Sequence, residues 1–357
     1  MNTYERFRKE LVRQLPSTVL YGNGYENYKN SRYVPDIVSE FGDFDVIYVM
    51  ELRDIRGEFG SNPWTGLDRI DIPKFIFRTD IHNCWKMYRT YIEKNDIRAV
   101  ISPYPEEYQE KKYGKHLGLS NDVSYIFLPH YIDPLIFHPY DEGKPFDVTL
   151  LGVFLRSPYL KIFHAARSYL NHIYHGQMDI ITLPLKYDIL RLFSMAFKDD
   201  YPLRTFVDRK LKNRRDITYF TKHHPGQLMG LNYDRVEDLI TAKYLIGENF
   251  ARAISASKIF ISSSSRWRIP LQKTFQGMGC GVCTFVDEPI GAKDLGFEDG
   301  YNLVYVDKKN VLDKINYYLR NEEEREIIAK NGLETIRKYH TISLRVRQFI
   351  NTLEEYI

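Results

Sequence analysis

Short apolar runs alternate with amphipathic helical patterns along most of the 357-residue chain. The runs are rich in β-branched and aromatic residues and lack a polar face, which favours strands of parallel sheets covered by helices on both sides. In the first part, the predicted strands are 17–21, 44–50, 74–79, 98–102 and 124–128, and the predicted helices are 84–94 and 106–117. In the second part, the predicted strands are 146–152, 178–182, 217–220, 258–262, 282–286 and 302–306. The helices predicted there are 158–174, 203–213, 236–255, 271–279, 311–319, 322–339 and 343–356.

The length of the chain and one polar segment predict two domains. A single hydrophobic core rarely grows beyond about 250–300 residues, which is fewer than this chain has. The segment His-Pro-Tyr-Asp-Glu-Gly-Lys-Pro at 138–145 interrupts the alternation with prolines, a glycine and charges, as interdomain linkers do. We therefore expect an α/β chain with Rossmann-like domains over 1–140 and 141–340. The C-terminal helix, 341–357, is free to cross back to the first domain.

Composition and charge exclude several classes of protein. The net charge of +3 is small for a nucleic-acid-binding protein, but it allows a local basic pocket. We expect a cytoplasmic protein without a transmembrane segment, because no run approaches roughly 18 apolar residues and the N-terminus has no apolar signal core. Cys84, Cys280 and Cys283 give no disulfide framework. The CxxC spacing at 280–283 has no second pair to complete a metal site, so we expect a packing role there and no metal or cofactor.

The segment 258–281 is the most informative candidate site. A predicted strand ends in four serines at 262–265, passes Arg266 and Arg268, and enters a helix that carries Lys273. Helix N-termini bind phosphates through their amide groups and the helix dipole, and three cations would add charge. Glycines 277, 279 and 281 would let the helix pack closely on the sheet and end sharply. The alternative interpretation is a surface loop with solvated arginines before a core helix.

This segment resembles a known family of enzymes. The residues Thr-Phe-Gln-Gly-Met-Gly-Cys-Gly-Val at 274–282 resemble the Phe-Glu-Ala-Met-Ala-Cys-Gly signature of family 4 glycosyltransferases. Pro270, Lys273 and Phe275 match the version found in their spore-coat-type (CgeB-like) relatives. Further resemblances follow in the same order over roughly residues 70 to 340. They lie at 129–137, 146–152, 201–204, 224–226 and 248–261.

The resemblance implies a GT-B fold, with two Rossmann-like domains facing a cleft, and transfer of a sugar from a nucleoside diphosphate sugar, most often of the UDP type. It further implies a metal-independent reaction that retains the anomeric configuration. The acceptor, which is a glycan, lipid, protein or modified base, is not encoded in a readable motif, and neither is the oligomeric state. Together with the residues themselves, the resemblance assigns the following residues to the donor site: Gly152, Arg204, His224, Ser265, Arg266, Arg268, Lys273, Thr274 and Gln276.

The chain departs from the family at two positions. The two glutamates of the family pattern fall at Arg268 and Gln276. An amide at 276 can still accept a hydrogen bond from a ribose hydroxyl, whereas a role that needs a carboxylate at 268 is lost. Two rival interpretations therefore stay open: a nucleotide-sugar epimerase on the same fold, and a catalytically weak nucleotide-sugar-binding or assembly protein.

Candidate residues on the sugar or acceptor side come mainly from the first domain. Asp80 and His82 follow the strand predicted at 74–79 and resemble the Asp-x-His of the same relatives, which implies a catalytic role. Their alternative role is to cap the next helix. Gly22 and Gly24 permit close approach of a ligand or form a plain turn, and His130 has a sugar-side or a structural role.

Overall fold

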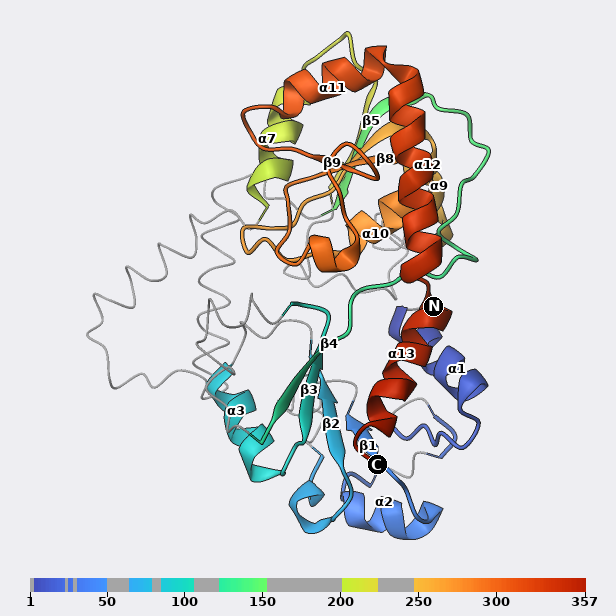
Figure 1. The fold of residues 1–357 in the computed structure, drawn as a ribbon, viewed down its shortest axis with the longest axis vertical. Helices are drawn as coiled ribbons and strands as arrows, with labels where there is room; N and C mark the ends of the chain where they lie inside the picture. The colour runs from blue at the N-terminus through green and yellow to red at the C-terminus, as the bar shows by residue number, and fades with distance from the viewer. Residues whose placement is uncertain are drawn as a thin grey trace, which may run out of the picture. The chain divides into compact units, whose positions relative to one another are not determined.

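The computed structural model describes residues 3–22, 25–27, 31–49, 64–78, 85–105, 122–152, 201–223 and 247–357. The chain forms two compact units. The first contains residues 1–129 together with 342–357, and the second contains residues 130–341. Each unit has one parallel sheet with helices packed against it (Figure 1). The predicted α/β class with two parallel sheets is therefore confirmed.

The sheet of the first unit has four parallel strands in the order β1-β2-β3-β4. They are β1 (Ile47–Val49), β2 (Lys74–Phe77), β3 (Ala99–Ser102) and β4 (Ser124–Phe127). Val49, Ile76 and Val100 are in register across the sheet, so their side chains share one face. That face packs against Val34 of α2 (Val34–Phe41) and Ile92 of α3 (Trp85–Lys94). A short 3-10 helix, η2 (Leu67–Arg69), adds the buried Leu67 to the same core.

The last helix of the chain belongs to the first unit. The ring of Phe349 on α13 (Ile342–Glu354) lies 5.6 Å from that of Phe7 on α1 (Thr3–Gln14) and 4.6 Å from that of Tyr48 on β1. Beyond the helix, the ring of Tyr356 lies 5.2 Å from that of Phe75. Since Tyr48 and Phe75 are paired in register, these contacts cover the second face of the sheet.

The sheet of the second unit has five parallel strands in the order β6-β5-β7-β8-β9. They are β5 (Phe146–Gly152), β6 (Tyr219–His223), β7 (Ser257–Ile261), β8 (Cys283–Val286) and β9 (Val304–Tyr305). One face buries Val148, Ile259 and Phe285 against α7 (Pro202–Leu211), α11 (Val311–Arg320) and the start of α12 (Glu322–Tyr339). On the other face, Phe260 contacts Phe250 of α9 (Gly247–Ser255) and approaches Gly277 of α10 (Gln272–Gly279). A 3-10 turn, η5 (Lys293–Leu295), precedes β9.

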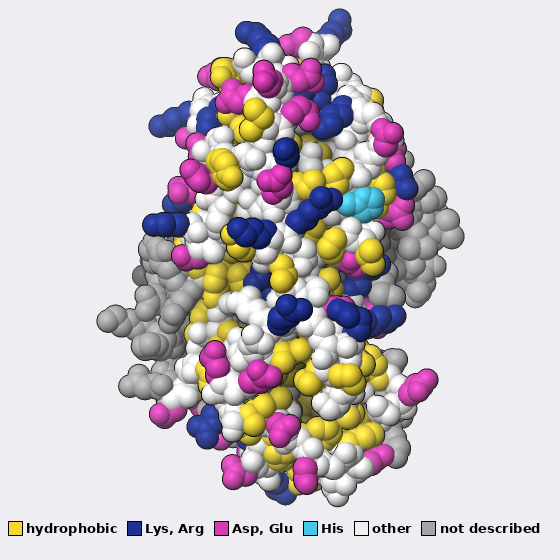
Figure 2. Space-filling view, turned by 45° about the vertical axis from the view of Figure 1, so that its right-hand side comes forward, with side chains coloured by type: hydrophobic (Ala, Val, Ile, Leu, Met, Phe, Trp, Pro, Cys, Tyr) yellow, Lys and Arg dark blue, Asp and Glu magenta, His cyan; other side chains and the backbone are white. Residues whose placement is uncertain are grey.

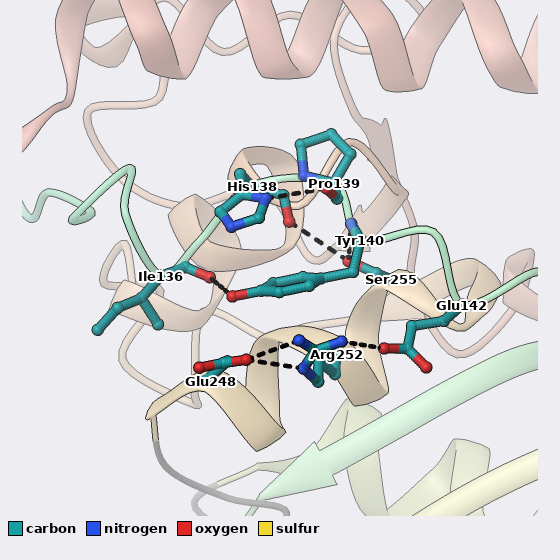
Figure 3. A network of polar contacts seen from close by, with 8 residues as sticks. All are labelled: Ile136, His138, Pro139, Tyr140, Glu142, Glu248, Arg252 and Ser255. Atoms are coloured by element: carbon teal, nitrogen blue, oxygen red, sulfur yellow. Dashed lines mark hydrogen bonds and ion pairs between the residues drawn. The ribbon is translucent and has the colours of Figure 1, made fainter.

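The boundary between the units falls about ten residues before the predicted one, because the segment expected to be a linker packs on the second unit. The Tyr140 ring lies between His138, with centroids 4.1 Å apart, and the Arg252 guanidinium at 4.4 Å (Figure 3). Arg252 belongs to α9 and is paired with Glu248 and Glu142. A linker that is polar in composition is thus fixed by stacking and ion pairs, which composition alone does not reveal.

The predicted elements differ from the structure at a few places. The predicted strand 17–21 is wrong: Thr18 closes a turn onto Leu15, and Tyr21 is held by its ring, 6.0 Å from that of Phe41. Helices α1 and α2 were not predicted. The elements predicted at 106–117, 158–174 and 178–182 lie outside the described residues.

Three observations bear on the expectations from composition. On the face shown in Figure 2, basic and acidic side chains are interspersed, in keeping with a small net charge. Cys280 and Cys283 are buried free thiols, and burial raises the pKa of both, that of Cys283 to about 12. Within the part of the chain that the structure describes, no helix is long and apolar enough to cross a membrane.

Candidate functional site

The carboxyl ends of the strands in the second unit define where a ligand is expected. In a parallel α/β sheet, ligands bind beyond these ends, at the point where the strand order changes direction. In the order β6-β5-β7-β8-β9, the chain passes from β6 over β5 to β7, so this point lies between β5 and β7. β5 ends at Gly152, and β7 continues into Ser262.

Two cations converge on Gly152 from different helices. A Cβ atom built on Gly152 would lie 2.6 Å from Nζ of Lys273 and 3.1 Å from Nη1 of Arg204. Gly152 also has a φ of +143°, a conformation that residues with a Cβ atom rarely adopt. The φ value favours glycine at 152, and the missing side chain lets both cations reach the strand end.

Lys273 lies in the first turn of α10. The residue as a whole is half-buried, and its amine donates a hydrogen bond of 3.0 Å to the Leu151 carbonyl and lies 5.1 Å from the centre of the Phe250 ring. Removal from water and the nearby Arg204 guanidinium lower the pKa of Lys273 well below its ordinary value. An anion bound at this point would raise the pKa of Lys273. Its negative charge would offset the repulsion from Arg204 and would favour the protonated amine despite its burial.

Arg204 projects from α7 and is 2% exposed. Its guanidinium lies 4.3 Å from the centre of the Tyr201 ring. Burial lowers the pKa of Arg204, and Tyr201 and Asp287 oppose that shift. An arginine stays protonated in a protein even so, and it therefore keeps a fixed positive charge beside Gly152.

The serine loop, residues 262–265, is held in place by Asp287 after β8. One carboxylate oxygen of Asp287 accepts a hydrogen bond of 2.8 Å from the Ser264 amide, and the other accepts one of 2.5 Å from its hydroxyl. Ser265 has a left-handed φ of +64°, and its hydroxyl accepts from the Trp267 amide at 3.2 Å. All four serines are buried, so they build the loop that connects the sheet to α10.

Arg266 and Arg268 follow the serine loop, and their surroundings differ from those of Arg204 and Lys273. The Arg268 side chain is 55% exposed, and its guanidinium donates to the Glu288 carbonyl at 2.9 Å and to the Glu288 carboxylate at 3.1 Å. The Arg268 carbonyl accepts from the Ile290 amide at 2.6 Å. Arg266 is half-buried, with its guanidinium 4.2 Å from the centre of the Trp267 ring. Arg268 therefore fastens the loop after β7 to the loop after β8.

The remaining predicted residues of the second unit lie on or near α10. Thr274 is buried, and its hydroxyl is 2.9 Å from that of Ser262. Gln276 is also buried, on the next turn of the helix. The His130 ring is 6.1 Å from the Phe275 ring, in an edge-on contact. These residues connect the helix to the strand end and to the segment that follows Pro129.

Gly22 belongs to the first unit, where a Cβ atom built on it would lie 4.0 Å from Trp64 and from Tyr25. The remaining predicted site residues, Asp80, His82, Gly24 and His224, lie outside the described residues.

Sequence reasoning missed three residues that shape this site. Tyr201 stacks on Arg204, Asp287 holds the serine loop, and Glu288 pairs with Arg268. Asp287 and Glu288 follow directly after a predicted strand, and this position was a signal, because side chains at the carboxyl ends of parallel strands meet at one edge of the sheet. Tyr201 lies in the segment 201–204 that resembles the family, but its stacking on Arg204 was not predicted from that resemblance.

Comparisons with known proteins agree with this architecture. Residues 205–351 match the family described as "Glycosyl transferase-like". No curated protein is significantly similar to the chain in sequence.

The solved structures that are similar in fold include the following two. The sucrose-phosphate synthase of Thermosynechococcus elongatus is 13% identical, with a TM-score of 0.53 over 91% of this chain and 77% of that one. A glycosyltransferase from Rickettsia africae ESF-5 is 12% identical, with a TM-score of 0.51 over 98% of this chain and 94% of that one. At these identities the likeness concerns the fold, and the predicted GT-B class with two Rossmann-like domains is confirmed.

Proposed function

We propose that this protein is a glycosyltransferase that takes its sugar from a nucleoside diphosphate sugar, and that Arg204 and Lys273 hold the diphosphate at Gly152. The observation that carries the proposal is the convergence of two cations on a strand end that admits no side chain. The family match of residues 205–351 supports the class of reaction.

The chemistry of sugar transfer explains why two cations are needed there. The bond from the anomeric carbon to the diphosphate breaks, and negative charge develops on the departing phosphate oxygens. Positive groups fixed in advance around that charge stabilise the transition state more than the ground state. Lys273 is in the first turn of α10, so the amide groups and the positive end of the helix dipole add to the same field. The proposal assigns charge compensation to these groups and includes no metal ion.

The other predicted donor residues take subsidiary roles in the proposal. Gln276 lies one turn along α10 from Lys273 and would accept a hydrogen bond from the ribose. Asp287 positions the serine loop, and Arg268 is kept at the edge of the site by Glu288. Retention of the anomeric configuration and a UDP-type donor remain expectations from the family resemblance.

Calorimetric titration with UDP, GDP and ADP tests the site. We expect one of them to bind, and we expect Lys273→Ala to weaken that binding by about 10–100-fold, the cost of a lost charge-assisted hydrogen bond. Gly152→Ala should weaken it similarly, because the new methyl group would displace the Lys273 amine. The matched control is Lys330→Ala on the exposed side of α12, which makes the same change of charge and should leave affinity unchanged. Absence of binding by all three nucleotides would remove the proposed function.

A second measurement separates a transferase from a binding protein. Transferases usually hydrolyse their donor slowly when no acceptor is present, because water replaces the acceptor. We expect free nucleoside diphosphate to accumulate from the matching nucleotide-sugar, and to accumulate more slowly with Lys273→Ala. Tight donor binding without any release over many hours would favour a binding or assembly role instead.

A further inference from the structure

We infer that Lys273 takes up a proton when a phosphate-bearing ligand binds, so that donor binding by this protein is proton-linked. This inference rests on the proposed function, because it concerns the same site. It adds a property that no resemblance implies: the site holds one fixed positive charge when empty and gains the second with its ligand.

Lys273 and Arg204 are crowded together beside Gly152. Nζ of Lys273 and Nη1 of Arg204 lie within 2.6 Å and 3.1 Å of a single point, the position of a Cβ atom on Gly152. Two like charges so close together repel each other strongly, more so where protein replaces water. A guanidinium does not lose its proton in a protein, so loss of a proton can relieve the repulsion at the lysine but not at the arginine.

The surroundings of Lys273 contain no compensating charge in the described part of the chain. β5 presents the Leu151 carbonyl to the amine, α9 presents the Phe250 ring, and the nearest residues of α10 itself, Gln272, Thr274 and Gln276, are neutral. α7 contributes Arg204, and the Tyr201 ring stacks on that guanidinium. Asp287, after β8, acts electrostatically on Arg204, and its carboxylate accepts both hydrogen bonds from Ser264.

A neutral lysine amine suits these contacts. It still donates to the Leu151 carbonyl, and it avoids placing an ammonium group beside a guanidinium. The lowered pKa of Lys273 has the same direction and the same causes, burial and Arg204. The residue keeps some exposed surface, through which a ligand and a proton can reach it.

A bound phosphate reverses this preference. Its negative charge attracts the ammonium form and screens it from Arg204, which raises the pKa of the lysine in the complex. Between the free and bound pKa values, each binding event takes up about one proton, and the dissociation constant rises roughly tenfold for each pH unit of increase. The sign follows from the shift: the group has the lower pKa in the free protein, so affinity is lost as pH rises.

Calorimetry in buffers of different ionisation enthalpy measures this uptake directly. UDP, GDP and ADP are titrated into the full chain at about pH 8, well above the second ionisation of a phosphate monoester near roughly 6, so that the ligand itself exchanges no proton. We expect net proton uptake for wild type and none for Lys273→Arg, which keeps the charge but cannot titrate. Lys330→Ala should behave like wild type.

The outcomes separate the inference from the proposed function. Binding of a nucleotide without proton uptake, or uptake that persists in Lys273→Arg, overturns the inference and leaves the proposed function intact. Failure of all three nucleotides to bind overturns both. If Lys273→Arg does not fold, the pH dependence of the wild-type dissociation constant still tests the inference. A dissociation constant that stays flat as pH rises from about 7 to 9.5 contradicts proton linkage, whereas the expected rise supports it.

Discussion

At the scale of single residues, Arg268 and Lys273 are only five positions apart in sequence, yet the electrostatic surroundings of their side chains differ. Arg268 is exposed and paired with Glu288. Among the described residues, the Lys273 amine has the Leu151 carbonyl and the Phe250 ring beside it, and Arg204 nearby. In the resemblance to family 4 glycosyltransferases, Arg268 falls at a position where that family's pattern has a glutamate. Its acidic partner Glu288 means that a carboxylate is still present at this edge of the site, but on the neighbouring loop.

This difference predicts a small effect of removing the Arg268 side chain. Exposed ion pairs contribute about 0–1 kcal/mol, so Arg268→Ala should lower the free energy of unfolding by less than roughly 1 kcal/mol. Nucleotide affinity should change less than about threefold, since the guanidinium is already held by Glu288. Calorimetry of Arg268→Ala beside Lys273→Ala measures the contrast. A loss from Arg268→Ala as large as that from Lys273→Ala would mean that Arg268 leaves Glu288 and binds the ligand.

The candidate site could be predicted only in part. The strand, the serine loop and Lys273 follow one another in sequence, so their proximity was foreseeable. Arg204 arrives from a helix some 50 residues before the strand β7. The sequence order of the motifs suggested that this arginine belongs to the site, but its convergence with Lys273 on Gly152 depends on how α7 packs, which no local pattern encodes.

At the scale of elements, the strands and helices that the structure describes in the second unit were predicted closely, because each has a strong apolar period and clear ends. The helix predicted over 322–339 coincides with α12. The prediction of a strand at 17–21 was wrong for a physical reason. The Tyr21 ring packs against the rings of Phe41 and Trp64, and such packing does not require the backbone to pair with a neighbouring strand. A hydrophobic pattern in the sequence predicts that a segment is buried more reliably than it predicts which element the segment packs against.

The packing of α10 on the sheet depends on Gly277. A Cβ atom there would lie 2.5 Å from Cδ1 of Phe260 and 2.7 Å from Oγ1 of Thr284, both on buried strands. In an exposed helix, glycine to alanine stabilises by about 0.5–1 kcal/mol, but overpacking a core costs roughly 1–3 kcal/mol. We therefore expect Gly277→Ala to lower the free energy of unfolding, as measured by denaturant titration, with Lys330→Ala unchanged as the surface control. A stabilised Gly277→Ala variant would show that α10 can move away from the sheet at little cost.

At the scale of the whole molecule, the first unit is built from both ends of the chain. Its sheet comes from residues before Pro129, and one of its covering helices is α13. Phe349 of α13 is 1% exposed and contacts the rings of both Phe7 and Tyr48. The first unit therefore completes its core only after the whole second unit has been synthesised. The second unit, residues 130–341, is continuous in sequence.

This arrangement predicts that damage to the C-terminal helix is confined to the first unit. Phe349→Ala should destabilise that unit by about 3–5 kcal/mol, the usual cost of removing a buried aromatic ring. Hydrogen exchange should then quicken in the amides of β1 to β4 and stay unchanged in β5 to β9. Leu344→Ala, on the exposed side of the same helix, is the matched control and should alter neither. Because Gly152, Arg204 and Lys273 all belong to the second unit, nucleotide affinity should survive Phe349→Ala. Equal acceleration of exchange in both sheets would show instead that the two units unfold as one.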